Sequence, residues 1–240
     1  MDEDIVSRRY LSGEYADKNP DWDSGDAPWK AALVKEIMER NSVHPQSLVE
    51  VGCGSGGVLA ELRSAYRDTR LSGYDIAPGA AGFWPRHAAA DIQFQVGDFL
   101  ALNDKVFDVV LMLDVLEHLG DPFSFLERLR SHSRFMVFHI PLDLSALSVL
   151  RETPLLHVRE QVGHLHYFTR KLALAMLEEC GYEIVEARYT GASFSAPRRS
   201  LKTKLAGLLR RAVFSLSHDF GARLMGGETL LVLARPRVQA

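Results

Sequence analysis

Cysteine is scarce in this sequence, which holds only Cys53 and Cys180 among 240 residues. Two cysteines so far apart form neither a disulfide framework nor the ligand spacing of a zinc site. The sequence also lacks a run of about 18 uncharged apolar residues, which a membrane-spanning helix would need. Its acidic first residues, MDEDIVSRRY, do not have the apolar core of a signal peptide. We therefore expect a cytoplasmic protein with reduced thiols.

An excess of charge of one sign is missing as well. The 28 basic residues nearly balance the 31 acidic ones, which gives a formal net charge of −3. The chain therefore has no net positive charge whose electrostatic field would attract nucleic acid, and no nucleic-acid partner is expected. Hydrophobic residues make up 47% of the chain and charged residues 25%, the proportions of an ordinary globular domain. Without internal repeats or low-complexity tracts, the chain is expected to form one enzyme-sized domain.

Short apolar runs alternate with segments of helical periodicity from residue 48 onward. Strands are expected at 48–51, 71–75, 92–96, 107–113, 134–140, 182–189 and 228–234. Helices are expected at 56–66, 78–89, 122–131 and 169–180. Strands and helices in alternation predict an α/β fold, a doubly wound, Rossmann-like sheet of seven mostly parallel strands with helices on both faces.

Two segments lie outside this alternation. Residues 1–47 contain loose turn signals followed by a helical pattern, and we interpret them as helices of a cap or lid. An insertion at about 191–227 separates the last two strands, and its basic amphipathic pattern predicts a helix at 198–216. Such a helix is most often packed on its own domain with solvated charges. The alternative is peripheral contact with an anionic membrane surface or an acidic partner.

Four glycines interrupt the segment LVEVGCGSGGVLAELRSAY, residues 48–66, directly after the first strand. Glycines at this point let backbone N–H groups approach a ligand closely, and the following helix presents its positive amino end. A nucleotide-like ligand is therefore expected. Gly52, Gly54 and Gly57 satisfy the GxGxxG spacing of dinucleotide sites, so the spacing alone leaves NAD open.

Three acidic residues near the ends of the first three strands narrow the choice of ligand. Glu50 precedes the first glycine in a buried strand, where a carboxylate needs a cationic neighbour rather than a pyrophosphate. Asp75 ends the second strand, where it can accept hydrogen bonds from ribose hydroxyls. Asp98 follows the third strand beside Phe99, and the pair can hold an adenine ring. A turn or helix cap is the alternative role for Asp98.

The segments EVGCGSG, GYDIAP, VGDF and FDVVLMLDVLEHLGDP, in this order, resemble class I S-adenosylmethionine-dependent methyltransferases. The resemblance covers about residues 48–190 and 228–235, and places a methyltransferase domain at 48–240. It implies a sheet whose last strand is antiparallel, and S-adenosylmethionine (S-adenosyl-L-methionine) as the cofactor. The cofactor-binding residues that it implies are Glu50, Gly52, Gly54, Gly56, Asp75, Ile76, Asp98, Phe99, Leu113 and His118.

Histidines gather where the acceptor of the methyl group would lie. His139 falls at the end of the fifth strand in FHIPLDLS, and the segment GHLHYF adds His164 and His166. One of these three could act as a general base, since imidazole has a near-neutral pKa. The resulting hypothesis is methyl transfer to an oxygen atom of a small-molecule or glycan-type acceptor, which includes sugar-linked molecules. Histidines with purely structural roles are the alternative for each position.

The sequence is also compatible with two other functions. A nicotinamide-dependent oxidoreductase fits the glycine spacing but not Glu50 or the segment VGDF. A noncatalytic module that binds an adenosyl ligand is a third hypothesis. His164 and His166 could form a metal site with His139 or Asp143, but the spacing is short and no cysteine joins them, so no metal is expected.

Overall fold

The computed structural model describes residues 5–22, 24–192 and 213–237. Seven strands form one sheet in the order β3-β2-β1-β4-β5-β7-β6. The strands are β1 Ser47–Val51, β2 Arg70–Asp75, β3 Ile92–Val96, β4 Phe107–Leu113, β5 Ser133–Leu142, β6 Tyr182–Tyr189 and β7 Glu228–Pro236. β1 to β5 pair in parallel, whereas β7 runs antiparallel to both β5 and β6. The expected sheet, with an antiparallel last strand, is confirmed.

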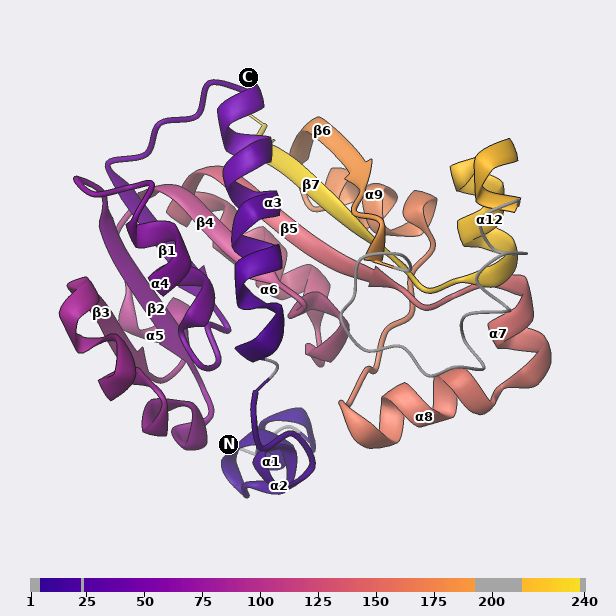
Figure 1. The fold of residues 1–240 in the computed structure, drawn as a ribbon, viewed down its shortest axis with the longest axis horizontal. Coiled ribbons are helices and arrows are strands. Elements are labelled where there is room, and N and C mark those ends of the chain that lie inside the picture. The colour runs from indigo at the N-terminus through magenta and orange to yellow at the C-terminus, as the bar shows by residue number, and fades with distance from the viewer. Residues whose placement is uncertain (1–4, 23, 193–212, 238–240) are drawn as a thin grey trace.

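Helices cover both faces of this sheet (Figure 1). The α-helices are α1 Ile5–Leu11, α2 Glu14–Lys18, α3 Ala27–Arg40, α4 Gly57–Arg63, α5 Phe99–Leu102, α6 Pro122–Leu129, α7 Ala146–Arg151, α8 Thr153–Gln161, α9 Arg170–Glu179 and α12 His218–Met225. Short 3-10 turns are η1 Ser24–Asp26, η2 Pro78–Gly82, η3 Trp84–Ala90, η4 Leu116–His118 and η5 Arg130–His132.

The alternation of side chains along the central strands divides the core into two clusters. One cluster holds Val49 and Met112 together with the buried faces of α6 and α9. The other holds Leu48 and Leu111 together with α3 and α4. Neighbouring residues of β1 and β4 thus point to opposite clusters, as the period of a strand requires. Because β1 and β4 are buried on both faces, packing in the core holds the residues at their carboxyl ends in place.

One expected helix is absent, because residues 78–89 form the two 3-10 turns η2 and η3 instead. Pro85 stands at the start of η3 and has no N–H to donate. A proline also disfavours helical backbone at the residue before it, here Trp84. The prediction of a continuous helix was wrong for this reason.

Three further segments bear on the site. α3 packs into the core, while α1 and α2 form a small pair near its beginning (Figure 1). The connection after β5 forms α7 and α8. Most of the basic helix expected at 198–216 lies outside the described residues. Among the helices that are described, none has both the length and the apolar character to cross a bilayer.

Candidate active site

A cavity of about 490 Å³ opens at the carboxyl ends of β1, β2 and β4. Open α/β sheets bind their ligands outside the carboxyl ends of the strands, where the strand order changes direction. In this sheet that point lies beside β1. The predicted site residues that line it are Glu50, Gly52, Gly54, Asp75, Ile76, Asp98, Phe99, Leu113, His118, His139 and His164. Gly56 and His166 are not part of its lining. The cavity therefore brings together most, but not all, of the residues selected from the sequence.

The glycine loop has the backbone conformation that its sequence demands. Gly52 and Gly54 have φ angles of +74° and +49°, which glycine adopts without strain. A Cβ atom on Gly52 would lie 2.6 Å from Cγ2 of Val115, so a side chain cannot be accommodated there. Gly56, also at positive φ, packs instead against Phe94 and Trp84 at the start of α4. The glycines of the loop thus present backbone to the cavity, and Cys53 and Ser55 between them also belong to its lining.

Glu50 is a buried carboxylate without a partner on one of its oxygens. Its side chain lies in β1, and Oε2 has no hydrogen bond within the described part of the chain. Burial raises its pKa to about 8, although the positive charge of Lys30 opposes this shift. A buried carboxyl group of this kind gains a great deal from a cationic ligand.

Asp75 organises the loop around it. Its Oδ2 accepts a hydrogen bond of 2.8 Å from the N–H of Gly54, and its Oδ1 accepts one of 2.8 Å from Ala77. Burial raises the pKa of this carboxyl group, and the two backbone hydrogen bonds oppose the rise. Because an ionised carboxylate can accept about four hydrogen bonds, Asp75 retains acceptor capacity for two hydroxyl groups.

Asp98 caps a helix as well as lining the cavity. Its Oδ1 accepts a hydrogen bond of 2.9 Å from the N–H of Leu100, so the capping role considered for it is present at the start of α5. Phe99 is buried and makes an edge contact with Tyr74. The cap leaves the second oxygen of Asp98 able to face a ligand.

Aromatic rings from the first helices cover the cavity. Tyr10, Tyr15 and Trp22 contact one another in turn, with ring centroids 4.9 and 5.1 Å apart. Tyr10 continues this row to His118, and Trp22 continues it to Phe83. We call the segment 5–22 the aromatic lid. The name follows the cap or lid expected for residues 1–47, and the three rings of the segment line the cavity.

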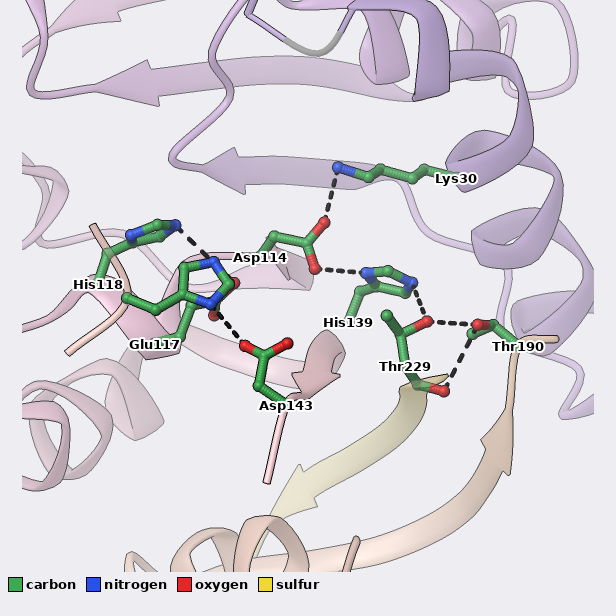
Figure 2. Close-up of polar contacts among 9 residues, drawn as sticks. Lys30, Asp114, Glu117, His118, His139, Asp143, Thr190 and Thr229 are labelled. Carbon is green, nitrogen blue, oxygen red and sulfur yellow. Dashed lines mark hydrogen bonds and ion pairs between the residues drawn. The ribbon is translucent and has the colours of Figure 1, made fainter. Parts of the chain in front are cut away.

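A chain of polar contacts runs along one side of the cavity (Figure 2). Lys30 Nζ lies 2.7 Å from Oδ2 of Asp114, and Nδ1 of His139 donates to Oδ1 of Asp114 over 2.6 Å. Nε2 of His139 shares a hydrogen bond of 2.9 Å with Thr229, which in turn contacts Thr190. Burial alone would raise the pKa of Asp114, but the nearby His139 and Lys30 hold it well below its usual range.

A second polar cluster lies where the turn after β4 meets the segment GHLHYF (Figure 2). Nδ1 of His164 donates to Oδ2 of Asp143 over 2.6 Å. Glu117 is fully buried, and its Oε1 lies 3.9 Å from Nε2 of both His118 and His164. Burial, with the negative charge of Asp114, raises the pKa of Glu117 well above its usual range. Burial and the neighbouring His164 lower the pKa of His118 to about 4.

Backbone contacts explain why these two distant segments meet. The carbonyl oxygen of Glu117 accepts hydrogen bonds from the N–H groups of Leu165 and His166, at 2.7 and 3.1 Å. The side chain of His166 donates from Nε2 to the carbonyl oxygen of Leu119 over 2.8 Å. His166 thus connects two loops, while His164 faces the cavity.

Several residues of the site were not selected from the sequence. Lys30 comes from the amino-terminal segment, and Thr229 comes from the last strand. Asp114 and Glu117 belong to the segment FDVVLMLDVLEHLGDP, where they follow the fourth strand. Position after a parallel strand is a sequence signal for Asp114 and Glu117, but it does not apply to Lys30 or Thr229.

A family model described as a methyltransferase domain matches residues 27–187. Ajmaline N-methyltransferase of Rauvolfia serpentina is 33% identical over 128 residues, which cover 48% of this chain and 44% of that protein. A ubiquinone biosynthesis O-methyltransferase of Pseudomonas entomophila is 33% identical over 97 residues, which cover 38% of this chain and 41% of that protein. The chain thus matches less than half of the length of these two curated relatives.

The fold is also similar to that of solved structures. One is the N-methyltransferase NodS from Bradyrhizobium japonicum in complex with S-adenosyl-L-homocysteine. Its TM-score is 0.59 at 17% sequence identity, over 96% of this chain and 98% of that one. At this level of identity the match supports the fold, and the family model supports the family.

Proposed function

The chain belongs to the methyltransferase-domain family, and we propose that it transfers a methyl group from S-adenosylmethionine to an oxygen atom of a small-molecule or glycan-type acceptor. The observation that carries the proposal is the pairing of His164 with Asp143 in the wall of a cavity that also holds Glu50 and Asp75. One half of the cavity suits the cofactor, and the other half offers a basic group to an acceptor.

The residues present fit S-adenosylmethionine. Glu50 supplies the unpaired buried carboxylate that the ammonium and sulfonium charges need. Asp75 has acceptor capacity for the two ribose hydroxyls, and Asp98 with Phe99 lies at the adenine end. When bound, the cofactor provides a methyl group on a positively charged sulfur, which makes that carbon open to displacement. The protein then has to align the reactants and exclude water.

Residues 1–47 serve as the cap of this site in our proposal. Trp22 lies over the glycine loop, since a Cβ atom on Gly54 would be 3.6 Å from its ring. Lys30 fixes Asp114 from α3, and this ion pair joins the cap to the turn after β4. The polar chain through His139 to Thr229 extends the same support to the last strand.

His164 is the best placed of the three candidate catalytic histidines. His139 uses both ring nitrogens, one for Asp114 and one for Thr229. His166 binds the carbonyl oxygen of Leu119 and does not line the cavity. His164 lines the cavity with Nδ1 fixed by Asp143, and its Nε2 has no hydrogen bond among the described residues, since the nearby Glu117 is 3.9 Å away. We assign to His164 the activation of the acceptor hydroxyl.

A labelling experiment tests this function. The protein is incubated with methyl-labelled S-adenosylmethionine and fractionated cell extract, and the labelled product is identified by mass spectrometry. A methyl ether, sugar-linked or not, is the expected product. A labelled amine would contradict the choice of oxygen but keep the enzyme class. Cofactor binding without any labelled product would instead favour a noncatalytic adenosyl-binding module.

A further inference from the structure

We propose that Glu117, His118 and His164 bind a divalent transition-metal cation, of the kind of Zn²⁺, in the wall of the cavity. Each residue offers one ligand atom, and these atoms lie within 4.8 Å of one another. All three side chains line the cavity. The sequence did not suggest this set, because Glu117 and His118 are far from His164 along the chain.

The carboxylate of Glu117 is the first reason. It is completely buried, and neither of its oxygens has a hydrogen-bond partner within the described part of the chain. A buried carboxyl group without a partner is costly, so such groups are normally paired or bind metals. Its ion-pair neighbours among the described residues are only the two imidazoles of His118 and His164. Lys30, the lysine that lines the same cavity, contacts Asp114 instead.

The geometry of the imidazoles is the second reason. Nε2 of His118 and Nε2 of His164 both lie 3.9 Å from Oε1 of Glu117, which is too long for a hydrogen bond. Ligand atoms around a tetrahedral Zn²⁺ with bonds of about 2.0–2.1 Å are roughly 3.4 Å apart. The two distances to Glu117 would have to shorten by about 0.5 Å, and no pair of ligand atoms in the set is more than 4.8 Å apart before the cation enters. Two histidines with one carboxylate form a ligand set common for zinc and for non-haem iron.

The surroundings of His164 are the third reason. Its Nδ1 donates to Asp143 over 2.6 Å, and a carboxylate in this position orients a histidine whose other nitrogen binds metal. The backbone hydrogen bond from Leu165 to the carbonyl oxygen of Glu117 holds both ligand segments together. The site is thus preorganised by contacts that do not depend on the cation.

The inference rests on the proposed function and refines the role of His164. Three protein ligands leave at least one coordination position open toward the cavity. A hydroxyl group bound to such a cation has a lowered pKa. His164 would then activate the acceptor oxygen through the cation, as one of its ligands, and the proton released from the hydroxyl would pass to solvent water.

Direct metal binding tests the proposal without any acceptor. The full chain is treated with a chelator and dialysed, and its binding of Zn²⁺ is measured by calorimetry and by elemental analysis. One bound equivalent is expected. Affinity should fall at least 100-fold in Glu117→Gln and in His118→Ala, and about 10- to 100-fold in Asp143→Asn, which removes only the orienting carboxylate. His157→Ala, an exposed histidine on α8, is the matched control and should bind as the wild type does.

Binding of S-adenosylhomocysteine by the same samples separates the possible failures. If Glu117→Gln, which changes no residue assigned to the cofactor, binds the nucleoside normally but loses Zn²⁺, the metal site is supported and misfolding is ruled out. If the wild type binds the nucleoside but no Zn²⁺, or if Glu117→Gln binds Zn²⁺ as tightly as the wild type, the metal site is rejected while the proposed function stands. In that case Glu117 would be assigned to a cationic group of the acceptor.

Discussion

Glu50 shows how one residue can carry the electrostatics of a binding site. Its position next to the glycine loop was found from the sequence, because a carboxylate at the end of a buried strand needs a cation. The structure supplies the cause, since burial without a partner on Oε2 raises its pKa to about 8. In the protein without a ligand, Glu50 is therefore largely protonated at neutral pH.

Replacing Glu50 by glutamine should change how stability depends on pH. The folded protein keeps the proton of Glu50 up to about pH 8, whereas the unfolded chain loses it near the ordinary value of 4.5. Between pH 4.5 and about pH 8 the folded state thus binds more protons than the unfolded chain. The contribution of Glu50 to the free energy of unfolding is therefore lost as the pH rises through this range. The loss amounts to roughly 1 kcal/mol per pH unit.

Urea unfolding at about pH 5.5 and about pH 7.5 measures this effect. The wild type should lose stability between the two values relative to Glu50→Gln, in which no group titrates at this position. Glu61→Gln, an exposed glutamate on α4, should behave as the wild type does. Equal slopes for wild type and Glu50→Gln would show that Glu50 does not hold a raised pKa.

Asp75→Ala should weaken cofactor binding. The substitution removes the acceptor for the ribose hydroxyls and also the two hydrogen bonds that hold Gly54 and Ala77. The expected loss is about 1.5–3 kcal/mol, or roughly 10- to 150-fold in the dissociation constant of S-adenosylhomocysteine. Calorimetry measures it, with the exposed Asp68→Ala as the control. An unchanged dissociation constant would exclude Asp75 from the cofactor site.

The sequence could predict residues that follow parallel strands, but not residues that reach the site from elsewhere. Asp75 and Asp98 were selected because they follow neighbouring strands, and both line the cavity. Lys30 reaches Asp114 from a helix, and Thr229 reaches His139 from an antiparallel strand. The sequence also could not rank the histidines, since their roles depend on which ring nitrogens are already bonded.

Among the elements, the aromatic lid is attached to the rest of the protein at one helix end. Arg9, Lys18 and Asn19 donate to the carbonyl oxygens of Arg159, Glu160 and Gln161 at the end of α8. The last carbonyl groups of a helix have no partner within the helix, so they are natural acceptors for such contacts. The lid and α8 should therefore move together when a ligand enters.

Trp22→Ala should lower cofactor affinity by removing the ring of the lid that lies over the glycine loop. The half-buried ring of Trp22 would contribute contact area and ring packing, so we expect about a tenfold rise in the dissociation constant of S-adenosylhomocysteine. Leu11→Ala changes an exposed apolar residue of the same lid and should leave the affinity unchanged. Equal affinities for Trp22→Ala and the wild type would mean that the lid does not contact the cofactor.

The sequence located the strands more accurately than the helical segment at 78–89, for physical reasons. All seven strands were located to within about two residues. The buried strands β1, β4, β5 and β7 give nearly continuous apolar runs, whereas the more exposed β3 and β6 alternate apolar and polar residues. The stretch at 78–89 was misjudged, since its alanines favour a helix but Pro85 prevents one. The antiparallel direction of β7 was expected from the resemblance to a family and not from periodicity, whereas its position between β5 and β6 was not predicted.

At the scale of the whole molecule, the cavity connects parts of the chain that are far apart in sequence. Its lining extends from Tyr10 in the lid to Thr229 in the last strand. The central strands below it contribute side chains to both core clusters. A ligand in the cavity therefore contacts the lid, the sheet edge and the GHLHYF segment at once, and it should stabilise the folded state as a unit.

Thermal unfolding with and without ligand tests this coupling and the choice of cofactor together. S-adenosylhomocysteine at about 100 times its dissociation constant should stabilise the folded state by about 2.7 kcal/mol. For a chain of this size that corresponds to a rise in Tm of roughly 5 to 10 °C.

NADH at the same concentration should give no rise, because Glu50 disfavours a pyrophosphate. Asp75→Ala should lose most of the shift, and Asp68→Ala should keep it. A rise with NADH and none with S-adenosylhomocysteine would overturn the cofactor assignment and favour an oxidoreductase.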